Sequence, residues 1–89
     1  MLTPEDQIEL RFALRRYLAA RPVAALTLDV LRHAMLTKGL DATDAEIRAE
    51  LTYWHLLPEP HLLRHPVPHS TEYAYQITST GRLADARGE

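Results

Sequence analysis

Apolar residues near the start of the chain recur at the spacing of an α-helix. Thr3 and Pro4 are a typical cap and first residue of a helix, and we expect the helix to run to about Ala20 because Pro22 prevents its continuation. One side of this helix carries apolar residues at helical spacing, namely Leu10, Leu14, Tyr17 and Leu18. The pattern predicts a helix that buries this side.

The same helix carries a second apolar group on nearly the opposite side, which includes Ile8, Phe12 and Ala19. A surface helix of a small monomer needs only one apolar stripe. Two interpretations stay open. In the first, Phe12 tucks beneath a loop; in the second, Ile8, Phe12 and Arg15 form the contact of a homodimer.

Two more helices are predicted in the middle of the chain. One runs from a cap at Thr27 to Lys38, with Gly39 as its stop, and the other follows a turn at Gly39–Ala42. Thr43 and Glu46 have the spacing of a capping box, and this third helix should end near Leu56. Its inward side carries Ile47, Leu51 and Trp54. Two helices joined by a short glycine-containing turn are typical of a helix-turn-helix.

The last third of the chain has the pattern of a β-hairpin. Leu62–His65 and Glu72–Thr78 are strand-like runs, and the second alternates Tyr73, Tyr75 and Ile77 with smaller or polar residues. The connector at Pro22–Leu26 has room for one short strand, and Ser79–Arg87 either forms a terminal helix or frays, with 84–89 as the frayed tail. We therefore expect a single α+β domain over 1–89, with three helices followed by a two-stranded hairpin.

Composition narrows the function classes. The chain has no cysteine, which excludes disulfides, thiolate metal sites and thiol catalysis. It has no apolar run long enough to span a membrane and no signal-peptide pattern at its start, so we expect a cytoplasmic protein. A net charge of −2 is unusual for a small nucleic-acid binder, although a local basic patch can suffice.

Candidate chemistry for an enzyme or a metal site is sparse. The chain has neither a glycine-rich phosphate loop nor a nucleophile elbow, so we expect no enzymatic activity and no cofactor. His61, His65 and His69 recur every four residues, a metal-ligand spacing on a helix, but the neighbouring prolines forbid that helix. We interpret these residues as loop histidines.

The order of helices, turn and hairpin ends in the segment Tyr75-Gln-Ile-Thr-Ser-Thr-Gly-Arg82. With this ending, the chain resembles winged-helix regulators of the MarR, PadR and ArsR kinds, in which an apolar-x-Thr-x-x-Gly segment closes the wing. It is more closely similar to small winged-helix proteins of Mu-like phages and prophages. The shared stretches are the opening Met-Leu-Thr, Leu31–Met35, the Ile-Arg-x-Glu-Leu-like run at Ile47–Leu51, and Thr78–Gly81.

This resemblance implies a winged helix-turn-helix that binds double-stranded DNA as a phage or prophage transcriptional regulator in the host cytoplasm. The alternative is a winged helix used as a protein-protein interaction or assembly module without DNA binding. The DNA-contacting residues would be Arg48, Thr52 and Tyr53 on the third helix and Arg64 and His65 on the wing.

Two observations weigh against the DNA interpretation. Acidic residues on the third helix would repel phosphates, and they are Asp44, Glu46 and Glu50. The outward side of that helix also carries small residues, which suit close approach to another protein. Two roles stay open for Arg64: it binds a phosphate, or it forms an ordinary cross-strand pair with Glu72.

Overall fold

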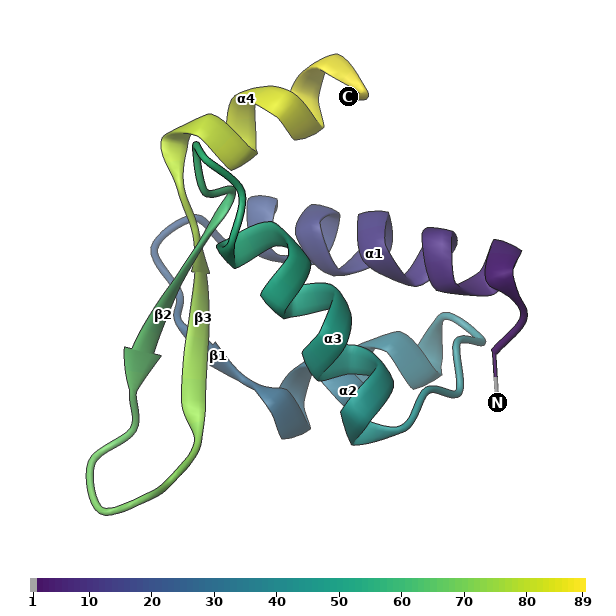
Figure 1. Ribbon diagram of the computed structural model, residues 1–89, viewed down its shortest axis with the longest axis horizontal. Helices are drawn as coiled ribbons and strands as arrows, with labels where there is room; N and C mark the ends of the chain where they lie inside the picture. Colours follow the sequence, from purple (N-terminus) through teal and green to yellow (C-terminus); the bar gives the residue numbers. More distant parts are fainter. Residues whose placement is uncertain (1) are drawn as a thin grey trace.

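The computed structural model describes residues 2–89, which form four α-helices and a three-stranded antiparallel sheet (Figure 1). In chain order the elements are α1 (Pro4–Ala19), β1 (Leu26–Thr27), α2 (Leu28–Thr37), α3 (Asp44–His55), β2 (Leu62–Pro66), β3 (Tyr73–Ile77) and α4 (Ser79–Arg87). The predicted α+β class is confirmed. The expected count of three helices and two strands is wrong, because α4 and β1 add one of each.

Local capping explains where two of the helices begin. The Thr3 hydroxyl accepts a hydrogen bond from the Asp6 amide at 3.1 Å, and the Thr43 hydroxyl accepts one from the Glu46 amide at 3.2 Å. Glu46 reaches back to the Thr43 amide at 2.9 Å, so the predicted capping box is complete. Thr27 precedes α2 as expected but makes no side-chain cap bond.

The sheet has the order β1-β3-β2, so the last strand in sequence lies in the centre (Figure 1). Leu26 pairs with Tyr75 on one side of β3, and Arg64 of β2 pairs with the same Tyr75 on the other. The connector between α1 and α2 therefore contributes a strand, as its length allowed. Pairing on both sides holds β3 in place and fixes the register of the β2–β3 hairpin.

The predicted alternation along β3 holds in part. Tyr75 and Ile77 are buried, whereas Tyr73, on the same face but next to the hairpin loop, is 38% exposed. Ala74, predicted on the outward face, is also buried. It lies between Thr27 of β1 and His65 of β2 in the sheet, so strands flank it on both sides.

The apolar core lies where three helices meet one face of the sheet. Its fully or nearly fully buried side chains include Leu10, Leu14 and Leu18 of α1, Leu31 and Met35 of α2, Ile47, Leu51 and Trp54 of α3, and Leu62, Tyr75 and Ile77 of the strands. Burying one leucine of this kind contributes about 1.5–3 kcal/mol. The inward faces predicted from spacing for the first and third helices are thus confirmed, with Tyr17 of α1 only partly buried.

A tight junction joins the hairpin to α4. The Thr78 amide donates to the His61 carbonyl oxygen at 3.0 Å, and its hydroxyl donates to the Pro60 carbonyl oxygen at 2.7 Å. The same hydroxyl accepts the Gly81 amide at 2.9 Å and caps α4. A Cβ on Gly81 would lie within 2.9 Å of the His61 Cα and still closer to its carbonyl oxygen. The Thr-x-x-Gly spacing is therefore required by this close backbone approach.

The C-terminal segment is a helix, so the frayed alternative is wrong. Gly88 ends α4 with a left-handed backbone at φ +74°, a conformation that glycine adopts freely. Its amide donates to the Asp85 carbonyl oxygen at 3.1 Å, and the Glu89 amide donates to the Ala84 carbonyl oxygen at 2.9 Å. The predicted frayed tail at 84–89 instead packs against α1 (Figure 1).

Arg15 is the residue that α4 covers. It is only 1% exposed, its Nη1 lies 3.1 Å from His61 Nδ1, and its Nη2 donates to the Glu89 carbonyl oxygen. Its Nε lies 3.6 Å from an Asp85 carboxylate oxygen. The expectation that Arg15 belongs to a dimer contact is therefore wrong, because the side chain is enclosed within its own chain.

Candidate functional site

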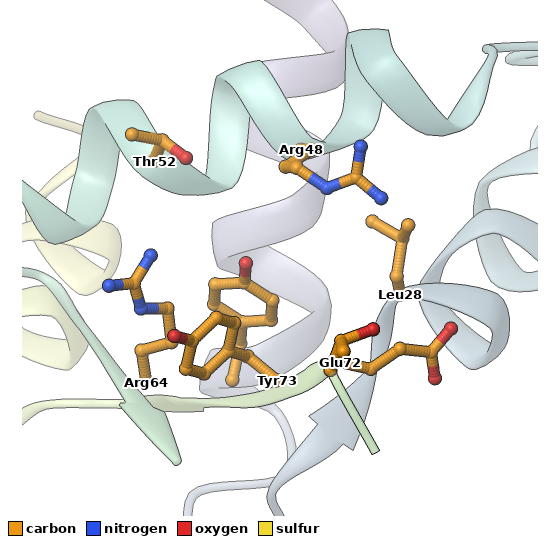
Figure 2. Close-up of a pocket in the computed structure, with 8 residues that line it drawn as sticks. Leu28, Arg48, Thr52, Arg64, Glu72 and Tyr73 are labelled. Atoms are coloured by element: carbon orange, nitrogen blue, oxygen red, sulfur yellow. The ribbon is translucent and has the colours of Figure 1, made fainter. Parts of the chain in front are cut away.

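A groove of about 320 Å³ lies between α3 and the β2–β3 hairpin (Figure 2). It brings together residues from four parts of the chain, and they are Leu28, Arg48, Thr52, Arg64, Thr71, Glu72, Tyr73 and Tyr75. Figure 2 shows Arg48 and Thr52 on one helix, with Arg64 and Tyr73 across from them on the strands. We call this the α3–hairpin groove.

The hairpin side of the groove is organised by strand pairing. Arg64 pairs with Tyr75, and because side chains alternate along a strand, Arg64, Tyr73 and Tyr75 all lie on the face toward α3. The Arg64 guanidinium carbon stacks 4.1 Å from the centre of the Tyr73 ring. Among residues 2–89 no ion pair joins Arg64 to Glu72, so the cross-strand alternative for this arginine is wrong.

Tyr75 forms the floor of the groove and is 3% exposed. Burial raises the pKa of its hydroxyl, and the positive charges of Arg64 and Arg48 only partly oppose that shift. The hydroxyl therefore stays protonated at neutral pH. A floor of this kind offers a hydrogen-bond donor between two guanidinium groups without adding negative charge.

The two flanks of α3 differ in charge because residues on a helix are about 100° apart. Arg48 and Thr52 lie on the flank toward the hairpin, whereas Glu46 and Glu50 lie on the flank toward α1. The carboxylate of Glu50 pairs with Arg11 at 2.6 Å and is 12% exposed. The acidic and basic residues of this helix thus face different neighbours.

Each acidic residue that weighed against phosphate binding has a partner within the fold. Asp44 lies 3.1 Å from Arg32 Nε, and Glu46 accepts the amides of Thr43 and Leu2 at 2.9 and 3.2 Å. These two amide donors lower the pKa of Glu46. Arg48, in contrast, has no ion-pair partner among the described residues. Charge in the groove is therefore more favourable to an anion than the composition of α3 suggests.

Two of the five predicted contact residues lie outside the groove. Tyr53 lies beneath Arg11, whose guanidinium carbon is 4.1 Å from its ring centre, and it points toward α1. His65 pairs with Ala74 and contacts Gln76 Oε1 at 3.0 Å, so it lies on the opposite face of the hairpin from Arg64. The structure brings together Arg48, Thr52 and Arg64 only.

The groove also contains residues outside the five predicted DNA contacts, namely Leu28, Thr71, Glu72, Tyr73 and Tyr75. The alternation along the second strand grouped the two tyrosines on one face. That signal did not show which residue of the first strand would lie opposite them, because cross-strand register depends on the loop and on the third strand.

The outer face of α1 keeps the second apolar group predicted for it. Ile8 is 53% exposed and Phe12 is 40% exposed. One edge of Phe12 packs against Trp54, with ring centres 5.5 Å apart at 75°. Trp54 in turn stacks on His61 at 4.9 Å and donates its Nε1 hydrogen to the Arg11 carbonyl oxygen at 2.8 Å. Phe12 therefore covers part of the core and leaves the rest of its ring in solvent.

His61 is enclosed between Trp54 and Arg15. Burial lowers its pKa most, the positive charge of Arg15 lowers it further, and the carboxylates of Glu59 and Glu89 act in the opposite direction. The described residues contain no group of three or more histidine, aspartate and glutamate side chains arranged to hold a metal ion. No helix within residues 2–89 is long and apolar enough to cross a membrane.

In comparisons with family models, with curated proteins and with solved structures, the chain has no match.

Proposed function

We propose that this chain is a small winged-helix protein that binds double-stranded DNA through the α3–hairpin groove and acts as a phage or prophage transcriptional regulator. The hairpin would be the wing, and α2 and α3 would be the helix-turn-helix. The observation that carries the proposal is the convergence of Arg48 and Thr52 of α3 with Arg64 of β2 on one groove. The four helices and three antiparallel strands are compatible with this fold.

The side chains in the groove have the chemistry that DNA contacts need. Guanidinium groups bind phosphate oxygens and the guanine edge in bidentate fashion, and a threonine hydroxyl bonds to either base or backbone. Arg48 and Arg64 come from different elements, so one duplex can contact both the helix and the hairpin. The Arg64 guanidinium lies over the Tyr73 ring, and this contact restricts the orientation of the guanidinium.

The charge balance limits the expected affinity. Glu72 also lines the groove, and the whole chain has a net charge of −2. With two arginines at phosphates, the logarithm of the binding constant should fall with the logarithm of salt concentration at a slope of about −2. We therefore expect binding that is clear at low salt and much reduced at moderate salt.

Exposed apolar and small residues favour a second candidate function, a protein-binding or assembly module. Ala45 and Ala49 lie exposed on the outward side of α3, and Leu56 immediately after it is 71% exposed. Such a surface suits close packing against another protein. In this case α3 would contact a protein partner, and replacing Arg48 or Arg64 would not specifically weaken the affinity for DNA.

The two functions are separated by fluorescence anisotropy with a labelled mixed-sequence duplex, at low and then at moderate salt. Arg48→Ala and Arg64→Ala should each weaken binding by about five- to 100-fold and reduce the salt slope by about 1. Arg82→Ala is the matched control, because it removes the same charge from an exposed position on α4. Absence of any affinity at low salt, or equal losses in all three variants, would refute DNA binding by this groove.

A further inference from the structure

The Tyr75 hydroxyl is a hydrogen-bond donor that has no acceptor among residues 2–89. Tyr75 is 3% exposed and lies at the floor of the α3–hairpin groove. The positive groups that act on its hydroxyl are the guanidinium groups of Arg64 and Arg48. A guanidinium has only donors, so neither arginine can accept the hydroxyl hydrogen. Because a buried donor normally has an acceptor, the partner of this hydrogen is expected on a molecule that enters the groove.

The surroundings of this donor favour an anion. Neither Arg48 nor Arg64 forms an ion pair within residues 2–89. The Tyr73 ring covers one face of the Arg64 guanidinium at 4.1 Å, which leaves the N–H groups at the edge of that plane available. A phosphate has acceptor oxygens in several directions, so it can accept from a guanidinium and from a hydroxyl at the same time. It would satisfy both the unpaired charge and the Tyr75 hydrogen.

The acidic residue of the groove lies away from Arg64. Glu72 is the carboxylate among the residues that line the groove. Figure 2 shows Glu72 beside Leu28 at one end and Arg64 at the other. A phosphate next to Arg64 is therefore separated from the carboxylate, and the Arg64 end is the part of the groove where an anion is most favourable.

We propose that the Arg64 end of the α3–hairpin groove is a phosphate subsite, in which the Tyr75 hydroxyl donates to one phosphate oxygen and the Arg64 guanidinium to another. Arg48 adds a second positive charge from α3. The proposal rests on the proposed function in one respect, namely that the phosphate belongs to the backbone of duplex DNA. A free phosphate ion offers the same chemistry, and a titration with inorganic phosphate separates the two sources.

Tyr75→Phe removes the hydroxyl and keeps the buried ring. In anisotropy measurements with the labelled duplex it should weaken binding about tenfold or more, the effect of one hydrogen bond to a charged group. The salt slope should keep its wild-type value because no positive charge is lost, whereas displacement of Arg64 would reduce the slope by about 1. Tyr17→Phe is the matched control and should bind within about twofold of wild type, because Tyr17 lies on α1 with Arg21 over its ring. Equal affinities of the two variants, or a reduced slope for Tyr75→Phe, would overturn the role of the hydroxyl.

Urea unfolding without DNA tests the missing acceptor itself. Removing a buried donor that has no acceptor should not destabilise the fold, so the unfolding midpoint of Tyr75→Phe should equal or exceed that of wild type. A lower midpoint would show that the hydroxyl is bonded within its own chain and would overturn the proposal. This measurement does not depend on whether the chain binds DNA.

Titration with inorganic phosphate, followed by NMR of the backbone amides, identifies the source of the phosphate. Wild type should show saturable shifts at Thr52, Arg64 and Tyr75 that chloride at the same ionic strength does not produce, and Tyr75→Phe should bind phosphate more weakly. If phosphate binds in this way and duplex DNA does not bind at low salt, the subsite stands with a free phosphate group as its ligand and the proposed function fails. If the duplex binds and Tyr75→Phe binds it as well as Tyr17→Phe does, the proposed function stands and the subsite is overturned.

Discussion

Replacing Gly81 by alanine has two opposing effects on the stability of the fold, and both come from the added Cβ atom. Gly81 is the third residue of α4, and its backbone conformation is one that any residue adopts. The added Cβ would lie within 2.9 Å of the His61 Cα and nearer still to its carbonyl oxygen. That backbone is held on both sides, because the His61 amide donates to the Trp54 carbonyl oxygen at 3.0 Å and its own carbonyl oxygen accepts the Thr78 amide at 3.0 Å.

The two effects differ in sign. Alanine in place of glycine within a helix lowers the free energy of the folded state by up to about 1 kcal/mol. Forcing a methyl group into a filled space costs about 1–3 kcal/mol, and more where backbone must move. Because the clash is with backbone, we expect it to dominate and to lower the free energy of unfolding by about 2 kcal/mol. For a domain of this size that corresponds to a decrease in Tm of roughly 8–16 °C.

Urea unfolding followed by the fluorescence of the single tryptophan, together with thermal unfolding, measures this loss. Gly39→Ala is the comparison variant, because Gly39 has φ +81° and open space around its Cβ position. It should cost about 1 kcal/mol from backbone strain alone. A Gly81→Ala chain as stable as wild type, or more stable, would show that helix propensity outweighs the contact and that the junction can yield.

Two further predictions concern pH and capping. Because the pKa of His61 is lower in the folded chain than its ordinary value of about 6.5 in the unfolded chain, the unfolded state binds the proton more readily. The stability contributed by neutral His61 should be complete above about pH 6.5 and should decrease as the pH falls toward the pKa of the folded chain. Urea unfolding across this pH range should show a smaller decrease in the free energy of unfolding for His61→Gln than for wild type. Equal decreases for the two chains would contradict this reasoning. Thr43→Ala removes the capping box of α3 and should lower the free energy of unfolding by about 1 kcal/mol in the same assay, whereas a loss below about 0.3 kcal/mol would mean that water replaces the cap.

The parts of the fold that could be predicted from sequence are those that neighbouring residues determine. Thr3 and Thr43 bond to amides three residues away, so their roles as caps can be recognised from spacing alone. The inward faces of α1 and α3 follow in the same way from helical periodicity. The Thr78–Gly81 segment was recognised as a motif, although its physical reason, the approach to His61, needed the structure.

The features that sequence reasoning missed depend on residues far apart in the chain. Arg15 reads as an exposed residue of α1, and it is buried only because His61, 46 residues later, and Glu89, 74 residues later, enclose it. The Arg64–Tyr75 register likewise depends on β1 holding β3 from the other side. Of the α3–hairpin groove, Arg48, Arg64 and Thr52 could be named from the sequence, whereas Tyr73 and Tyr75 opposite them could not.

The central position of β3 also bears on how the protein avoids aggregation. Within residues 2–89, β2 pairs with all five residues of β3 on one side and β1 pairs with Ala74 and Tyr75 on the other, so the outer strands of the sheet are β1, two residues long, and β2, five residues long. β2 ends in Pro66, which has no amide hydrogen to donate, and carries Arg64 and His65 along its length. Charged, short and proline-terminated edges are poor templates for another strand. The strand with the most β-prone sequence thus lies in the centre of the sheet, where its backbone is paired with β2 along its whole length and with β1 at Ala74 and Tyr75.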